Sequence, residues 1–62
     1  MKIKEIREKN GITQDELARK LNVKQSAVAM WEAGKNSPTA AKIPTLARVL
    51  GCEINDLFDA EK

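Results

Sequence analysis

The side chains between Gln25 and Met30 make an unusual exposed face for a short surface helix. Helical spacing places Gln25, Ser26, Ala29 and Met30 on the outer side, where a surface helix normally carries lysine and glutamate. An amide supplies both a hydrogen-bond donor and an acceptor, and its neighbours here are mostly small. This face follows a first short helix across a tight turn, an arrangement that indicates a helix able to enter a DNA groove.

The other reactive side chains argue against catalysis. The chain contains no histidine and a single cysteine, Cys52. Histidine is the usual general base, and without it or a cysteine cluster a metal site would depend on carboxylates alone. We therefore expect no catalytic residues, no metal, no cofactor and no small-molecule substrate.

Size and charge narrow the class of protein further. With 62 residues the chain is expected to be a single domain, residues 1–62, too small for both a substantial core and a deep pocket. It has no signal peptide and no apolar run near the roughly 20 residues of a membrane span, so we expect a cytoplasmic protein. Residues 1–38 carry eight basic and five acidic side chains, whereas residues 39–62 carry three and four. A polyanion-facing side, if present, therefore belongs to the first two thirds of the chain.

The elements that must position these side chains are all helices, since no stretch alternates like a strand. Glycines follow the first, third and fourth helical patterns, where a left-handed residue ends a helix. Pro44 prevents a regular helix through residues 40–50, so a loose turn over 39–42 should precede a helix that has Pro44 in its first turn. The five expected helices are about 2–10, 14–21, 25–33, a helix that has Pro44 in its first turn and ends at residue 50, and 54–58 or 59.

The second and third expected helices have opposite start signals. Thr13 and Glu16 have the spacing of a capping box, with Ile12 and Leu17 placed as a hydrophobic staple. Asn22 suits the left-handed backbone of the turn between the two helices. Lys24 stands where a serine or aspartate cap would be better, so the start of the third helix is locally weak.

Apolar spacing predicts the core. Val28 and Trp31 lie three residues apart and should support the third helix from behind. The other side chains expected to face inward are Ile3, Ile6, Leu17, Ala18, Leu21, Val23, Ile43, Leu46, Ala47, Leu50, Ile54, Leu57 and Phe58.

Residues 3–58 resemble the helix-turn-helix domain of the phage lambda-repressor and Cro-type regulators. The spacing of the whole series is intact, which makes the resemblance specific. The matching residues are Ile6-Arg7, Thr13-Gln14-x-Glu16-Leu17-Ala18, Val23-x-Gln25-Ser26-x-Val28, Trp31-Glu32-x-Gly34-Lys35, Pro38, Leu46-Ala47, Leu50-Gly51 and Leu57. The resemblance implies a compact five-helix, lambda-repressor-like bundle with its helix-turn-helix at the second and third helices.

The resemblance also implies roles for particular residues. Base edges would be met by Gln25, Ser26, Ala29 and Met30, and the physics agrees, since glutamine can bond adenine N6 and N7 together. DNA phosphates would be contacted by Gln14, which would also help to orient Gln25, and by Lys35 and Asn36. Lys24 departs from the small polar cap usual in the family and is a further candidate for a phosphate contact. Arg7 and Glu32 match an ion pair that ties the first helix to the third.

The resulting hypothesis is a sequence-specific regulator of transcription that acts as a repressor by occupying a pseudo-palindromic operator. Its partner is double-stranded DNA, bound as a homodimer, with no membrane involved. Two alternatives remain. The fold could serve as a protein-interaction module, antitoxin or antirepressor-like, or the chain could be the N-terminal part of a longer regulator. For the interaction module, the distinguishing sign is failure to bind DNA even at low salt.

Overall fold

Five α-helices and one 3₁₀ turn make up the regular structure of residues 1–58, the part of the chain that the computed structural model describes. No strand occurs in this range, so the predicted all-α class is confirmed. The elements are α1 (Ile3–Lys9), α2 (Gln14–Leu21), α3 (Gln25–Ala33), η1 (Ala40–Lys42), α4 (Ile43–Leu50) and α5 (Ile54–Leu57).

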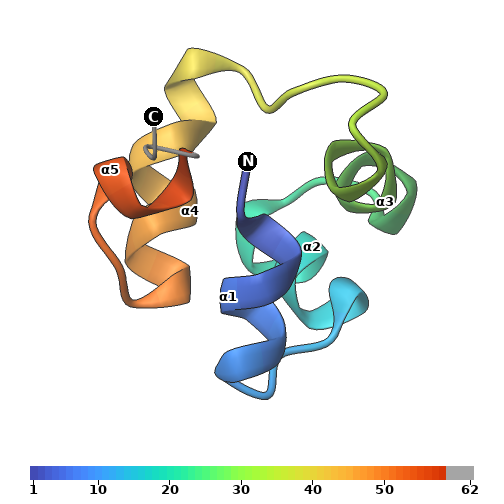
Figure 1. Ribbon diagram of the computed structural model, residues 1–62. Coiled ribbons are helices and arrows are strands. Elements are labelled where there is room, and N and C mark those ends of the chain that lie inside the picture. The colour runs from blue at the N-terminus through green and yellow to red at the C-terminus, as the bar shows by residue number, and fades with distance from the viewer. Residues whose placement is uncertain (59–62) are drawn as a thin grey trace.

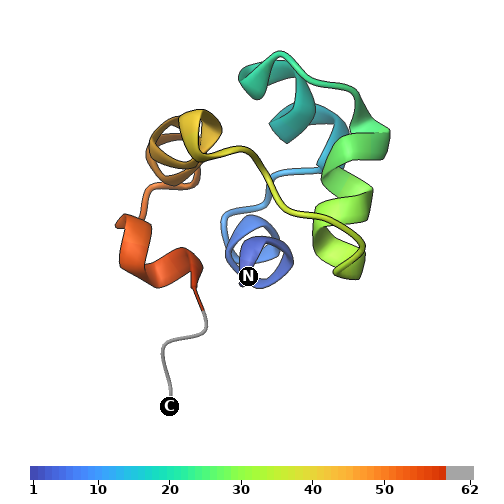
Figure 2. The ribbon, with the colours of Figure 1, turned by 90° about the horizontal axis from the view of Figure 1, so that it is seen from above.

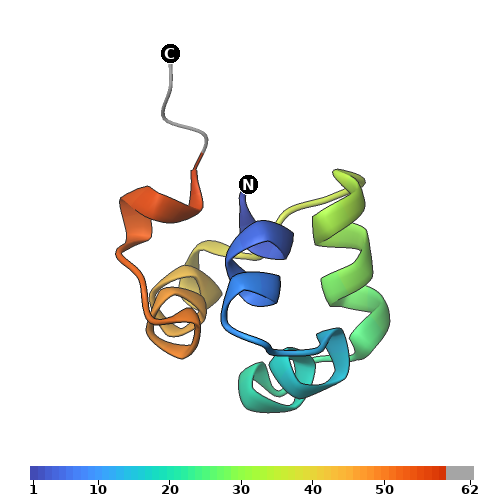
Figure 3. The ribbon, with the colours of Figure 1, turned by 60° about the horizontal axis from the view of Figure 1, so that its bottom comes forward.

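Helix α1 occupies the centre of the arrangement (Figure 1). Seen from above, α2 and α3 lie on one side of α1, and α4 and α5 lie on the other (Figure 2). The segment after α3 crosses over to reach η1 and α4, and α2 packs against both α3 and α4. The remaining side of α3 faces outward at the edge of the molecule (Figure 3). The fold therefore leaves one face of α3 available to a partner.

The local signals around α2 and α3 are confirmed. Thr13 Oγ1 accepts from the backbone N–H of Glu16, and Glu16 Oε1 accepts from the N–H of Thr13, which completes the capping box. Asn22 has a left-handed backbone, with φ of 60°, and ends α2. Lys24 gives α3 no side-chain cap, as expected. The start of α3 is therefore held by tertiary contacts rather than by its own cap.

The core lies between α1, α2, α3 and α4. Pro44 sits in the first turn of α4, directly after η1, as the sequence predicts. Leu17, Val28 and Leu46 are fully buried, and Trp31 is 8% exposed. The buried side chains of the hydrophobic core are Ile3, Leu17, Ala18, Leu21, Val28, Trp31, Leu46, Ala47, Leu50 and Leu57, and Pro38 is buried as well. Ile6, Ile12, Val23 and Ile43 pack against this cluster while remaining partly exposed.

Two predicted core residues are wrong. Ile54 and Phe58 are 43% and 46% exposed, and among the inward residues expected around α5 only Leu57 is buried. The reason is the length of α5, because a four-residue helix turns just once and has one position facing inward. Ile54 and Phe58 therefore form an apolar surface near the end of the described chain.

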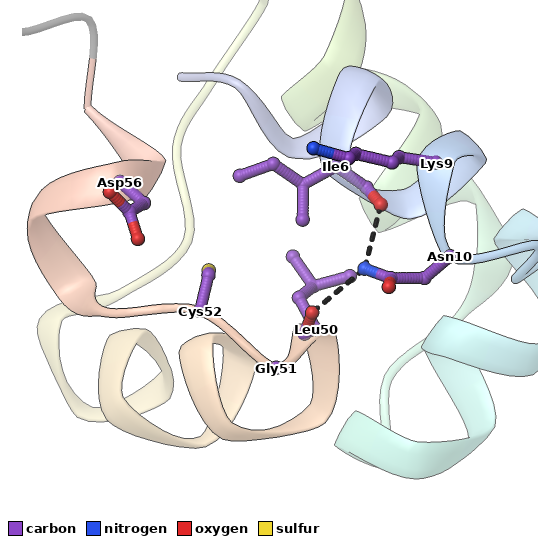
Figure 4. A pocket seen from close by; sticks show the side chains of 7 residues that line it. All are labelled: Ile6, Lys9, Asn10, Leu50, Gly51, Cys52 and Asp56. Carbon is purple, nitrogen blue, oxygen red and sulfur yellow. Dashed lines mark hydrogen bonds between the residues drawn. The ribbon is translucent and has the colours of Figure 1, made fainter.

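Side chains satisfy helix ends on both sides of the molecule. Asn10 Nδ2 donates to the carbonyl of Leu50 at the end of α4 (2.8 Å) and to the carbonyl of Ile6 (2.9 Å), beside a pocket between α1 and the α4–α5 connection (Figure 4). Lys42 Nζ donates to the carbonyl of Leu21 at the end of α2 (2.9 Å). The carbonyls of Leu50 and Leu21 lie in the last turns of their helices, where no intrahelical N–H reaches them, whereas the carbonyl of Ile6 also accepts from the backbone N–H of Asn10. The residues lining the pocket are Ile6, Lys9, Asn10, Leu50, Gly51, Cys52 and Asp56.

Candidate nucleic-acid interface

The outer face of α3 presents the side chains that the sequence singled out. Gln25 and Ser26 are exposed, Met30 is 40% exposed, and Ala29 is half-buried. Val28 and Trp31 anchor the opposite face of the same helix in the core. Because the backing side chains are rigidly packed, the exposed ones project from a helix with a fixed position.

A chain of hydrogen bonds links the start of α3 to α1. Gln25 Nε2 donates to Gln14 Oε1 (3.2 Å), and Gln14 Nε2 donates to Glu32 Oε1 (2.9 Å). Glu32 in turn accepts from Arg7, from Nε to Oε2 (2.6 Å) and from Nη2 to Oε1 (3.1 Å). Four of the residues named from the sequence thus meet in one continuous network, which spans α1, α2 and α3.

The inner end of this network is an ion pair with little contact with water. The side chains of Arg7 and Glu32 are 10% and 5% exposed, and Arg7 Nη1 also donates to the carbonyl of Ile12 (2.8 Å). Burial opposes ionisation of Glu32, but the hydrogen bonds from Arg7 and Gln14 outweigh it and lower the pKa of the carboxyl. The Arg7 pKa is raised, chiefly by its hydrogen bond to Glu32. Both groups are therefore charged at neutral pH.

Polar and cationic side chains flank α3 at both ends. Lys24 directly precedes the helix, and Gln14 is the first residue of α2. Lys35 and Asn36 are exposed just after Gly34, whose left-handed backbone ends α3. Unlike Gln14, the residues Lys24, Lys35 and Asn36 make no side-chain hydrogen bond within residues 1–58. Their positions at the two ends of the helix suit contacts to the phosphates on either side of a groove.

Sequence reasoning missed several contacts that hold this surface. The bond from Gln14 to Glu32 joins residues 18 apart in the chain, and the bond from Lys42 to Leu21 joins residues 21 apart. Neither contact has a local signal, since a lysine before a helix and a glutamine at a helix start are both common on solvated surfaces. A pairing of polar residues across the turn between α2 and α3 could have pointed to the first of them.

Other kinds of site find little support in residues 1–58. No group of three or more potential metal ligands occurs there, and no described helix is long and apolar enough to cross a membrane. Cys52 is half-buried against the core, and its thiol pKa is raised by burial and by the charge of Asp56. A raised pKa leaves the thiol protonated and therefore weakly reactive at neutral pH.

Comparison with known proteins gives one consistent result. A helix-turn-helix family model matches residues 3–57. An uncharacterised HTH-type transcriptional regulator of Archaeoglobus fulgidus is 40% identical over 57 residues, which cover 92% of this chain and 81% of the relative. One from Methanothermobacter thermautotrophicus is 39% identical over 57 residues, 90% of this chain and 83% of the relative. The HTH-type transcriptional activator BcrR of Enterococcus faecalis is 28% identical over 61 residues, 98% of this chain but 30% of the relative.

Proposed function

The chain belongs to the lambda-repressor and Cro-type helix-turn-helix family of transcriptional regulators, and from this premise we propose that it is a sequence-specific DNA-binding repressor. It inserts α3 into the major groove of a pseudo-palindromic operator. Occupancy of the operator is sufficient to block transcription, and it requires no surface beyond the one that holds DNA.

The outer face of α3 carries this proposal. Its nine residues extend about 13.5 Å at 1.5 Å per residue, which is enough to cross a major groove about 12 Å wide. Gln25 and Ser26 would meet bases from the first turn of α3, and Ala29 and Met30 from the next. Alanine and methionine can pack on a thymine methyl group, and glutamine can bond adenine. The face is therefore suited to reading base edges rather than to being solvated.

Contacts to phosphates would set the position of α3 on the duplex. Gln14 and Lys24 stand at the starts of α2 and α3, where free backbone N–H groups and the helix dipole favour an anion. Lys35 and Asn36 stand at the other end of α3. We propose that these four residues bind phosphates and that Gln14 does so while holding Gln25.

We further propose that two copies bind together. Few cations face the DNA, so one copy alone would gain little affinity from phosphate contacts and would bind weakly. A homodimer would place its two α3 helices in successive major grooves about 34 Å apart. The exposed side chains Ile54 and Phe58 offer apolar area for such a contact, at the end of the molecule away from α3. Residues 1–62 would act as one DNA-binding domain, in the cytoplasm, where prokaryotic DNA lies.

Selection of duplexes from a randomised pool by the purified protein tests the proposal as a whole. We expect enriched sequences to share two inverted half-sites one helical turn apart. Enrichment without any common motif would contradict sequence-specific binding, and no DNA binding even at low salt would favour the protein-interaction module.

Replacing Gln25 by alanine should weaken binding to the selected operator by about 1–3 kcal/mol for each half-site, because one bidentate base contact is lost there. Preference should relax at one base pair in each half-site, while the rest of the motif is kept. Competition between operator duplexes that differ at single base pairs measures both effects. An unchanged base profile for Gln25→Ala would show that this residue does not read DNA.

Replacing Lys35 by alanine should weaken binding to all duplexes alike and lower the slope of log affinity against log salt by about one unit for each bound copy. The physical reason is the loss of one released counterion per phosphate contact. Arg48→Ala is the matched control, since it also removes one exposed cation but from α4. Equal salt slopes for the two variants would refute a phosphate contact by Lys35.

A further inference from the structure

Glu32 and Gln25 are linked through Gln14 by two hydrogen bonds, and which atom donates in each bond determines what Gln25 presents to its surroundings. We propose that Glu32 acts as a positioning residue: it fixes which end of the Gln25 amide faces the DNA, so the protein prefers adenine over guanine at the contacted base. This inference rests on the proposed function, since it specifies what the same α3 surface reads.

The order of donors begins at Glu32. Its carboxylate is ionised, and an ionised carboxylate can only accept hydrogen bonds. Oε2 already accepts from Arg7 Nε, and Oε1 accepts from Arg7 Nη2 and from Gln14. Whichever atom of the Gln14 amide faces Glu32 must therefore be its nitrogen. The buried charge leaves the Gln14 amide one orientation.

That orientation passes to Gln25. With its nitrogen turned to Glu32, Gln14 presents Oε1 on its other side, and there it accepts from Gln25 Nε2 (3.2 Å). Gln25 spends one N–H on this bond. One N–H and the oxygen Oε1 remain free on an exposed side chain at the start of α3. The protein thus offers the DNA a donor beside an acceptor, in a fixed order.

This order matches one purine and not the other. Adenine presents N7 as an acceptor and N6 as a donor in the major groove, which a donor beside an acceptor can bond together. Guanine presents two acceptors, N7 and O6, and needs two donors. We call the chain of hydrogen bonds from Glu32 through Gln14 to Gln25 the relay. Without it, the terminal torsion of an exposed glutamine is broad and nearly two-fold, so the amide could turn over. The network from α1 through α2 removes that freedom before DNA arrives.

The decisive variant reverses the relay. In Gln14→Lys the introduced ammonium still donates to Glu32, but it cannot accept from Gln25. The Gln25 amide is then expected to turn its oxygen to the ammonium and both N–H groups outward, the pattern that guanine accepts. We expect the ratio of affinities for adenine and guanine duplexes at that position to fall roughly tenfold or more. Fluorescence anisotropy with paired duplexes measures this ratio.

Two further variants separate positioning from folding. Gln14→Met cuts the relay but leaves Arg7 and Glu32 paired, so the adenine preference should fall without a turn towards guanine. Arg7→Met combined with Glu32→Gln replaces the carboxylate by an amide that can donate or accept. Gln14 and Gln25 are untouched there, yet the adenine preference should still weaken. Thermal melts establish that each variant is folded.

The controls distinguish this inference from the proposed function. In a Gln25→Ala background, Gln14→Lys should leave the ratio of affinities for adenine and guanine duplexes unchanged, because no amide is left to turn. If the wild type selects adenine at that position and all three relay variants keep the full preference, the inference is overturned while DNA reading by Gln25 stands. Selection of guanine by the wild type would also overturn it. Absence of any sequence preference in the wild type would instead refute the proposed function.

Discussion

Trp31→Ala should lower the free energy of unfolding by about 3–5 kcal/mol, the largest effect expected of any single substitution here. Trp31 is 8% exposed in the core cluster, and it supports α3 from the side opposite the exposed Gln25 and Ser26. Alanine would lose the apolar transfer free energy of the indole and leave a cavity that the small core can fill only in part. A domain of this size has a total stability of about 5 kcal/mol or somewhat more, so a large unfolded fraction is expected at 37 °C.

Urea denaturation followed by far-ultraviolet circular dichroism measures this effect, because the variant lacks the single tryptophan that fluorescence would need. Phe58→Ala is the matched control, since it removes an aromatic side chain that is 46% exposed. We expect that control to stay within about 0.5 kcal/mol of the wild type, at concentrations where the protein is monomeric. A similar small change for Trp31→Ala would show that the indole does not support α3.

Arg7→Met should lower the free energy of unfolding by about 3 kcal/mol, the second largest expected effect. The substitution keeps much of the apolar length of the side chain and removes the charge. The Glu32 carboxylate, 5% exposed, would then remain buried without its cation, and the carbonyl of Ile12 would lose its donor. Removing one partner of such a pair costs far more than the pair itself contributes, because the remaining charge stays desolvated.

Two measurements test whether the unpaired charge of Glu32 causes this loss of stability. Adding Glu32→Leu to Arg7→Met should recover most of the lost stability, since no unpaired charge remains.

The stability of Arg7→Met should also depend on pH in a different way from that of the wild type. In the wild type the Glu32 pKa is lowered from its ordinary value of 4.5, so its stabilising contribution is present above that pH and is lost as the pH falls through the lower, folded pKa. In Arg7→Met the main cause of the lowering is gone and burial raises the pKa. Lowering the pH therefore raises the free energy of unfolding that the buried Glu32 leaves to the variant, whereas it removes the stabilising contribution of Glu32 from the wild type.

The difference in stability between the two proteins should accordingly shrink as the pH falls, first above 4.5, through the raised pKa of the variant, and then below 4.5, through the lowered pKa of the wild type. A difference that stays constant from neutral to acidic pH would contradict the assignment of its cause to the ion pair. Equal instability of the single and double variants would contradict it as well.

Much of the fold could be predicted because its signals are local. The Thr13–Glu16 capping box, the Asn22 turn and the position of Pro44 each act within a few residues, and all three are confirmed. Val28 and Trp31 could be assigned to the core because the period of α3 repeats over nine residues. The short helix α5 has no such repeat, and this is why Ile54 and Phe58 were wrongly placed inside.

In the candidate site too, local features could be predicted from the sequence and long-range contacts could not. Its residues could be named from their types and spacing along α2 and α3, but the bond between Gln14 and Glu32 depends on how the two helices pack. So do the bonds from Lys42 to Leu21 and from Asn10 to Leu50, which join residues 21 and 40 apart. Hydrogen bonds across such separations follow from tertiary geometry, for which a single sequence has no periodic signal.

The two ends of the described chain are fastened to each other at one corner of the molecule. The backbone N–H of Lys2 donates to the carbonyl of Leu57 (2.7 Å), and Leu57 is the one buried side chain of α5. Opening this corner uncovers a single leucine, whereas loosening α3 would uncover both Val28 and Trp31. Low-energy fluctuations should therefore concentrate beside Ile54 and Phe58. In the proposed homodimer, the contact between the copies would therefore lie at the end of the molecule that deforms most easily, and α3 at the end that deforms least.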